Sequence, residues 1–283
     1  MYWQLFVIVN LITASLLVPL QRLFLRKRET DPITFTVVSQ LATGILLLPV
    51  AIVHGLQIPD LSRFGFAILT MFSVYAVAHY LYAHTLKQVE ASIFSTLINT
   101  STVWVVLMGY FILHETLHIS DIVGTAIIMA SVFMLMEHKR RKLQLERSIL
   151  MGLLIGLLFG IGSSIWVYVG RHTDAISWTT LCFFATPTIF LAIKPSISKK
   201  AIEFVKGKII YKIIILAVIW AIDNLASLSA YQHGQVSIIA PLLQTSAILT
   251  VIVAVVFLHE RTRLRWKIAA AVVCFTGVVL LTS

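Results

Sequence analysis

The sequence predicts an all-α integral membrane protein with ten transmembrane helices in two inverted five-helix repeats. Three observations predict this fold class: a strongly apolar composition, about ten apolar runs of spanning length, and basic residues gathered in alternate loops. Of the 283 residues, 59% are hydrophobic and 12% are charged. Soluble domains have about 45–50% apolar and about 25% charged residues. A soluble fold of this chain would therefore lack the polar residues that cover a surface.

The apolar runs have the length that a bilayer requires, because a spanning helix needs about 20 mostly apolar residues. Asp31 and Pro32 stand at the start of the second run, where a capping side chain and a first-turn proline favour a helix. The predicted spans are 3–20, 33–53, 65–85, 91–113, 119–136, 149–170, 175–193, 209–229, 236–258 and 264–281.

The second half of the chain repeats part of the first at a shift of 145 residues. The tripeptide Leu-His-Glu ends at Glu115 and again at Glu260. The same shift aligns polar or aromatic residues inside the spans, namely Tyr75 with Trp220, His79 with Asn224, and Asn99 with Gln244. Spans three to five match spans eight to ten in this way, which predicts a duplication. We expect a first five-helix repeat at 1–142 and a second at 143–283.

The charges in the loops predict the topology. An odd number of spans in each repeat forces the second repeat to cross the membrane inverted. Loops after odd-numbered spans contain 20 of the 22 Lys and Arg residues, whereas loops after even-numbered spans contain only Arg63 and Arg171. By the positive-inside rule, we expect a multi-pass protein of the cell (inner) membrane with both termini outside. The net charge of +10 thus reflects topology, and we expect no nucleic-acid partner.

Short motifs in both halves resemble the EamA family of the drug/metabolite transporter superfamily. They are Asp31-Pro32, residues 91–94 through 113–117, and residues 236–242 through 258–262. Pro241 belongs to the second-half motif, and Thr96 stands at its place in the first half. The resemblance implies a secondary carrier for amino acids or related metabolites, in many members an exporter, with a central cavity between the halves.

Polar side chains inside the spans predict where a substrate binds. Such residues are costly in lipid and normally face a bundle interior or a wet cavity. Helical spacing places those of the third and eighth spans in one stripe on each helix. We expect a shared substrate cavity lined by Tyr75, His79, Tyr82, Asn99, Trp220, Asp223, Asn224 and Gln244. The alternative is that polar residues only form hydrogen bonds across helix contacts.

Asp223 is the only one of the twelve acidic residues that lies deep inside a predicted span. Removal from water favours the neutral form of a carboxyl group, which suits proton exchange. We expect Asp223 to bind the amino or cationic group of a substrate or to carry a coupling proton, with His79 as a candidate partner. A purely structural, hydrogen-bonded acid is the alternative.

Glu115 and Glu260 end the fourth and ninth spans, where they either hold the turn into the next span or act in gating. Residues His114 to His118 also fit H-E-x-x-H, the motif of zinc proteases. The repeat partner at 259–263 keeps the glutamate and lacks the second histidine, and no third ligand motif follows. We therefore expect neither a metal nor an enzyme, and keep the intramembrane metalloprotease only as a remote alternative.

A channel and a membrane sensor or scaffold are the other alternative functions. The sequence has no G-x-x-x-x-G-K-[ST] phosphate loop, so ATP does not drive this chain directly. The expected partners are a small-molecule substrate and the lipid bilayer, with no cofactor. A coupling proton and a homodimer are left open as further partners.

Overall fold

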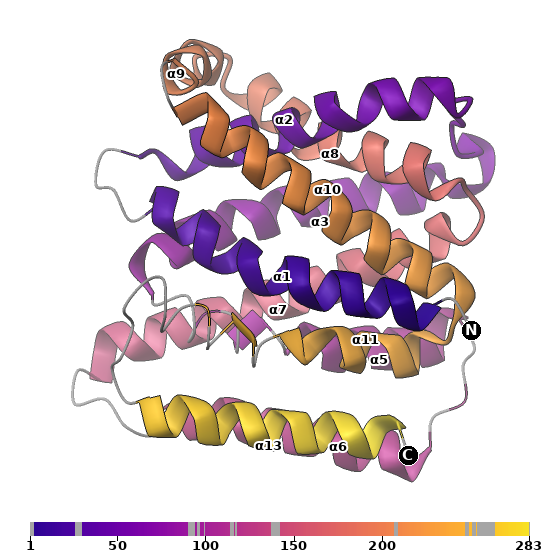
Figure 1. Ribbon diagram of the computed structural model, residues 1–283, viewed down its shortest axis with the longest axis vertical. Helices are drawn as coiled ribbons and strands as arrows, with labels where there is room; N and C mark the ends of the chain where they lie inside the picture. Colours follow the sequence, from indigo (N-terminus) through magenta and orange to yellow (C-terminus); the bar gives the residue numbers. More distant parts are fainter. Residues whose placement is uncertain are drawn as a thin grey trace.

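The computed structural model describes residues 3–25, 30–89, 94, 97–98, 100–113, 116, 118–136, 142–206, 209–246, 249–250, 253 and 264–282. Within these ranges the chain is helical and contains no strand. The helices lie side by side in one bundle, and the start of α1 and the end of α13 lie at the same end of it (Figure 1). The helices are α1 (Trp3–Leu25), α2 (Pro32–Val53), α3 (Leu61–Gln88), α5 (Ser101–Leu113), α6 (Ile119–Met136), α7 (Lys142–Gly170), α8 (Ala175–Ile193), α9 (Ile197–Phe204), α10 (Ile209–His233), α11 (Val236–Gln244) and α13 (Leu264–Thr282).

Six stretches of the described chain are long and apolar enough to cross a membrane: α1, α2, α3, α8, α10 and residues 150–170 of α7. They coincide with the first three and the sixth to eighth predicted spans. Helices α6 and α13 lie at the fifth and tenth predicted spans, and α5 and α11 occupy parts of the fourth and ninth. The all-helical, multi-span prediction is therefore confirmed, and the count of ten spans stays a prediction.

Two predicted connections are partly helical, which corrects the expected boundaries. Helix α7 begins at Lys142, inside the basic linker, and α9 occupies most of the connection at 194–208. Helix α9 is amphipathic: Ile197 is buried, whereas Lys199 and Lys200 are exposed. A helix of eight residues is too short to span a bilayer, and basic side chains on one face suit the membrane surface.

Carboxylate side chains cap three of the spanning helices. The predicted start of α2 is confirmed: Oδ2 of Asp31 accepts a hydrogen bond from the amide of Thr34 at 3.2 Å, with Pro32 at the first position. Asp60 caps α3, and Asp174 caps α8. Such caps satisfy amide groups that have no partner inside the helix.

The packing of the helices has a two-fold pattern. Helix α1 packs against α10 and α3 packs against α7, while α2 pairs with α8, α5 with α11, and α6 with α13. Helices at the same position in the two halves are α1 and α7, α2 and α8, α3 and α10, α5 and α11, and α6 and α13. When the members of each such pair are exchanged, the contact of α1 with α10 becomes that of α7 with α3, and the other three contacts stay the same. The pair α6–α13 lies along one side of the bundle (Figure 1).

Glycines bring α7 close to α5. A Cβ atom on Gly156 would lie 2.1 Å from Oγ1 of Thr100, and a Cβ atom on Gly160 would lie 2.3 Å from Cβ of Trp104. These glycines are four residues apart on α7, so both face α5. Small residues at this spacing let membrane helices pack backbone to backbone. The close approach of α7 to α5 fixes the wall of the cavity described below.

The outward faces of the bundle are apolar. On α3, Phe66 is 87% exposed and Leu69 is 66% exposed, and Ile45 of α2 is 61% exposed. A large exposed apolar surface is rare on a soluble monomer. Lipid is the solvent that suits these faces.

Candidate functional site

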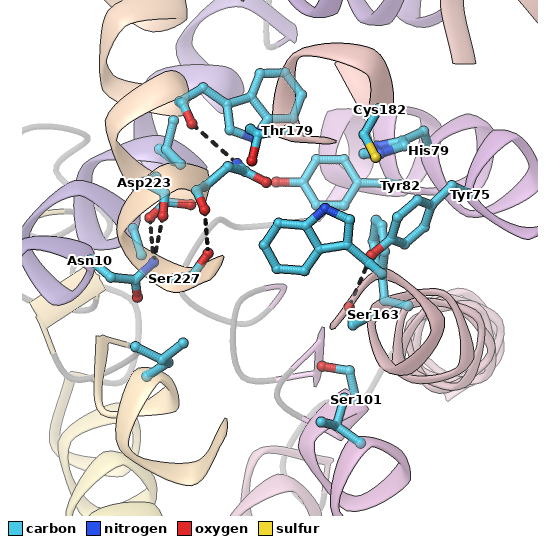
Figure 2. A pocket seen from close by; sticks show the side chains of 18 of the residues that line it. Asn10, Tyr75, His79, Tyr82, Ser101, Ser163, Thr179, Cys182, Asp223 and Ser227 are labelled. Carbon is cyan, nitrogen blue, oxygen red and sulfur yellow. Dashed lines mark hydrogen bonds between the residues drawn. The ribbon is translucent and has the colours of Figure 1, made fainter. Parts of the chain in front are cut away.

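A central cavity of about 330 Å³ lies between the two halves of the bundle. Its described lining comes from α1, α2, α3, α5, α7, α8, α10 and α11, together with Ser246. Seven of the eight predicted substrate-binding residues line it: Tyr75, His79, Tyr82, Trp220, Asp223, Asn224 and Gln244. The eighth, Asn99, lies outside the described residues. Figure 2 shows side chains from several helices around this space.

Asp223 of α10 has hydrogen-bond partners on α1. Its Oδ1 accepts hydrogen bonds from Nδ2 of Asn10 at 2.9 Å and from Oγ1 of Thr13 at 3.0 Å. Nδ2 of Asn10 also donates to the backbone carbonyl of Asp223 at 3.2 Å. No described residue donates to Oδ2 of Asp223, so this oxygen is left for a solute or water in the cavity. Figure 2 shows Asn10 reaching the carboxyl group.

Aromatic rings surround His79 on the opposite side of the cavity. The His79 ring lies 5.2 Å from that of Phe159 and 6.2 Å from that of Trp220, measured between centroids. The ring of Tyr82 is also close to Phe159, at 5.9 Å. Within the described chain no hydrogen bond joins His79 to Asp223, so the expected partnership does not form. The partners of Asp223 come from α1 because α1 packs along α10.

Two tyrosine hydroxyl groups hold neighbouring helices in place. The hydroxyl of Tyr75 is 3.1 Å from Oγ of Ser163, which joins α3 to α7. The hydroxyl of Tyr82 donates to Oε1 of Gln21, which joins α3 to α1. These bonds fix the two aromatic rings at the cavity wall.

Among the described residues, three buried polar side chains at the cavity wall each have one atom without a hydrogen-bond partner. The atoms are Oε1 of Gln40 on α2, Oγ1 of Thr102 on α5 and Oγ1 of Thr179 on α8. All three side chains are at most 2% exposed. A buried polar atom without a partner costs about 1–3 kcal/mol. A polar solute in the cavity would remove that cost.

The helices that wall the cavity are tied together at both ends of the bundle. At one end, Nη1 of Arg22 on α1 donates to the carbonyl of Leu86 on α3, and Nζ of Lys87 donates to the carbonyl of Thr30 at 2.6 Å. We call this set of contacts the α1–α3 latch. It joins the connection after α1 to the end of α3.

At the opposite end, the corresponding helices of the second half form the α7–α10 latch. Arg171 donates to the carbonyls of Tyr231 at 3.1 Å and Gly234 at 2.8 Å. Nε2 of Gln232 donates to the carbonyls of Gly170 at 2.6 Å and Thr173 at 3.0 Å. The acceptor Tyr231 lies 145 residues after Leu86, and Gln232 lies 145 residues after Lys87, the shift that aligns the two halves in sequence.

Several residues at the cavity were not predicted from the sequence. They include Asn10, Gln40 and Thr179 of the lining, and Thr13, which donates to Asp223 without lining the cavity. Asn10, Thr13 and Gln21 fall on one face of α1 at helical spacing, which is a signal that could have indicated them.

The remaining predicted positions are the motif residues Pro241, Glu115 and Glu260. Pro241 is buried within α11 and does not line the cavity. Glu115 and Glu260 lie outside the described residues, as does most of the H-E-x-x-H stretch. Its last histidine, His118, is exposed.

The sequence of each half matches a family of transporters. Residues 1–137 match the EamA-like transporter family, and residues 142–283 match solute carrier family 35. Both are families of the drug/metabolite transporter superfamily, and this chain belongs to that superfamily as a multi-pass membrane transporter.

Two individual proteins are similar to this chain. An uncharacterized protein of Methanocaldococcus jannaschii is 26% identical over 138 residues, which are 49% of this chain and 98% of the relative. A protein of known crystal structure has a TM-score of 0.72 at 13% identity and covers 98% of both chains. At this identity the second similarity shows the fold alone.

Proposed function

We propose that this protein is a secondary active transporter that carries a small metabolite across the cell membrane by alternating access, in the direction of export. The central cavity carries the proposal. It is lined by aromatic and polar side chains of both halves. Polar groups inside a membrane-spanning bundle are costly unless they face partners or a wet cavity, so their clustering here points to a polar solute. Export is the direction that the resemblance to the EamA family implies.

We further propose that residues 1–142 and 143–283 are inverted repeats. The two-fold pattern of helix packing supports this, and so do the latches at opposite ends of the bundle, in which Leu86 and Lys87 correspond to Tyr231 and Gln232 at the shift of 145. A relative whose length is about half of this chain suits a duplicated unit. With inverted repeats, breaking one latch and keeping the other opens the cavity to one face of the membrane at a time.

The loop charges assign the two ends to the two faces. The α1–α3 latch lies at the end where the loops contain most Lys and Arg residues, so it closes the cytoplasmic side. The α7–α10 latch then closes the outer side, where both termini lie.

Asp223 is the proposed contact for the amino or cationic group of a substrate or for a coupling proton. One of its oxygens is free of described partners, and the other is held in place by Asn10 and Thr13. A carboxyl group in a spanning helix costs about 2.5–3.5 kcal/mol on the insertion scale. Acidic residues inside spanning helices therefore normally bind a ligand, carry a proton or pair with another group of the protein.

Counterflow in liposomes that contain the purified protein tests the proposal. A carrier preloaded with unlabelled solute takes up labelled solute with saturable kinetics and then releases it. A channel would show non-saturating flux, and a sensor or scaffold would show no flux. Loss of counterflow in Asn224→Ala and Gln244→Ala, with Ser73→Ala on the outer face of α3 unchanged, would tie the transport to this cavity.

A further inference from the structure

We infer that the substrate is a small organic cation with an ammonium group and without a carboxylate or phosphate group. The inference rests on the proposed function, since it concerns the same cavity. It is narrower than the amino acids that the family resemblance implies, because an amino acid brings a negative charge with it.

The charges of the cavity wall are the first argument. Asp223 is the only acidic residue among the described side chains of the lining, and none of these side chains is Lys or Arg. The sequence places all 22 Lys and Arg residues at or beyond the ends of the predicted spans. An ammonium group finds a counter-charge in this cavity. A carboxylate or phosphate would find no Lys or Arg among the described lining residues and would be repelled by an ionised Asp223 at low dielectric.

The aromatic rings are the second argument. Trp220 lies one helical turn before Asp223 on α10, and its ring is 5.4 Å from that of Phe183. Across the cavity, Phe159 stands 5.9 Å from both Tyr75 and Tyr82. The faces of aromatic rings attract cations and do not attract anions. A carboxyl oxygen and several such rings that line one cavity form the kind of site that recognises an organic ammonium ion.

The unpartnered oxygens are the third argument. Oε1 of Gln40 is buried without a partner, and no described residue donates to Oδ2 of Asp223; both oxygens can only accept hydrogen bonds. The hydroxyl oxygens of Thr102 and Thr179 accept as well as donate. A primary ammonium group has three donors and no acceptor. A carboxylate has no donor and would leave Oδ2 and Oε1 unsatisfied. The lining therefore matches a ligand that donates.

Matched pairs of an amine and its parent amino acid test the inference, because the members differ only in the carboxylate. We would measure thermal stabilisation of the purified full-length protein by tyramine against tyrosine and by phenethylamine against phenylalanine. Stabilisation should follow ligand concentration by mass action. We expect each amine to bind about tenfold or more tightly than its amino acid, since a charged group without a partner is left over in the latter.

The variant Asp223→Asn should remove the response to both amines. It is expected to fold, because the amide oxygen of Asn still accepts from Asn10 and Thr13, and the unfolding temperature of the ligand-free variant checks this. Ser73→Ala, which alters an exposed hydroxyl of α3 that is bonded to its own helix, should respond like the wild type.

The outcomes separate this inference from the proposed function. Amino acids that stabilise as well as their amines, or amine binding that survives in Asp223→Asn, would overturn the inference. If amines fail and another solute shows saturable counterflow, the inference is wrong and the transporter proposal stands. If no solute shows counterflow, the proposed function fails as well.

Discussion

Replacing Gly160 by alanine should push α5 away from α7 and disturb the cavity that these helices wall. The new Cβ atom would lie 2.3 Å from Cβ of Trp104, whereas carbon atoms in contact are about 3.5–4.0 Å apart. The helices must therefore separate by about 1 Å or more, because the obstacle sits next to the backbone of α5 and cannot rotate away. Overpacking of this kind costs about 1–3 kcal/mol. Alanine recovers about 0.5–1 kcal/mol through its better helix propensity, so the net effect is destabilising.

Gly65→Ala is the matched control for this prediction. No neighbouring atom of the described residues lies within 4 Å of a Cβ built on Gly65, so alanine there gains helix propensity without a clash. Thermal unfolding in detergent should show a lower midpoint for Gly160→Ala and an unchanged or higher midpoint for Gly65→Ala. The KM for transport should rise only in Gly160→Ala, because α7 and α5 present Phe159 and Thr102 to the cavity. Equal or higher stability of Gly160→Ala would refute the close packing of α7 on α5.

Three further changes test other parts of the structure. Asn10→Ala leaves Oδ1 of Asp223 with Thr13 alone, and we expect the free energy of unfolding to fall by about 1–2 kcal/mol. This loss should be largely absent when the same change is made in Asp223→Ala, which has no side-chain acceptor. Arg171→Gln weakens the α7–α10 latch, because hydrogen bonds from a charged donor contribute about 1.5–3 kcal/mol. A thiol reagent applied from the outer face should then label Cys182 in the cavity faster. The control Arg63→Gln should leave this labelling rate unchanged. Hydrogen bonds from the Ser62 hydroxyl and amide hold the pKa of Asp60 below its ordinary value of 3.8. The stabilisation from this cap on α3 is therefore present above about pH 4 and is lost as the pH falls through the pKa of Asp60 in the folded protein. A carboxyl NMR titration with a midpoint at or above 3.8 would contradict this.

The sequence predicted the cavity best where polar residues stand out from apolar surroundings and recur in the repeat. Asp223 is conspicuous as a buried acid, and Tyr75 and His79 were supported by Trp220 and Asn224 at the same shift. Their helical spacing placed each set on one face, and the structure brings both faces to one cavity.

The contributions of α1, α2 and α8 could not be predicted in the same way. Asn10 and Gln40 are single amides in long apolar runs, and such residues often only join neighbouring helices. The first two spans of each half also align poorly, so no repeat partner singled them out. Which helix lies beside α10 depends on tertiary packing, and that packing determined the true partners of Asp223. Helix α9 was missed because eight residues with two adjacent lysines do not resemble a span.

The central claim is that one cavity between the two halves opens to each side of the membrane in turn. Cys182 on α8 lines this cavity and is a native probe for it, once Cys274 on α13 is replaced by serine. Membrane-impermeant thiol reagents applied from one side at a time should label Cys182 from both faces, and a transported solute should protect it from both. Labelling from one face only, or labelling that a transported solute does not slow, would contradict alternating access through this site.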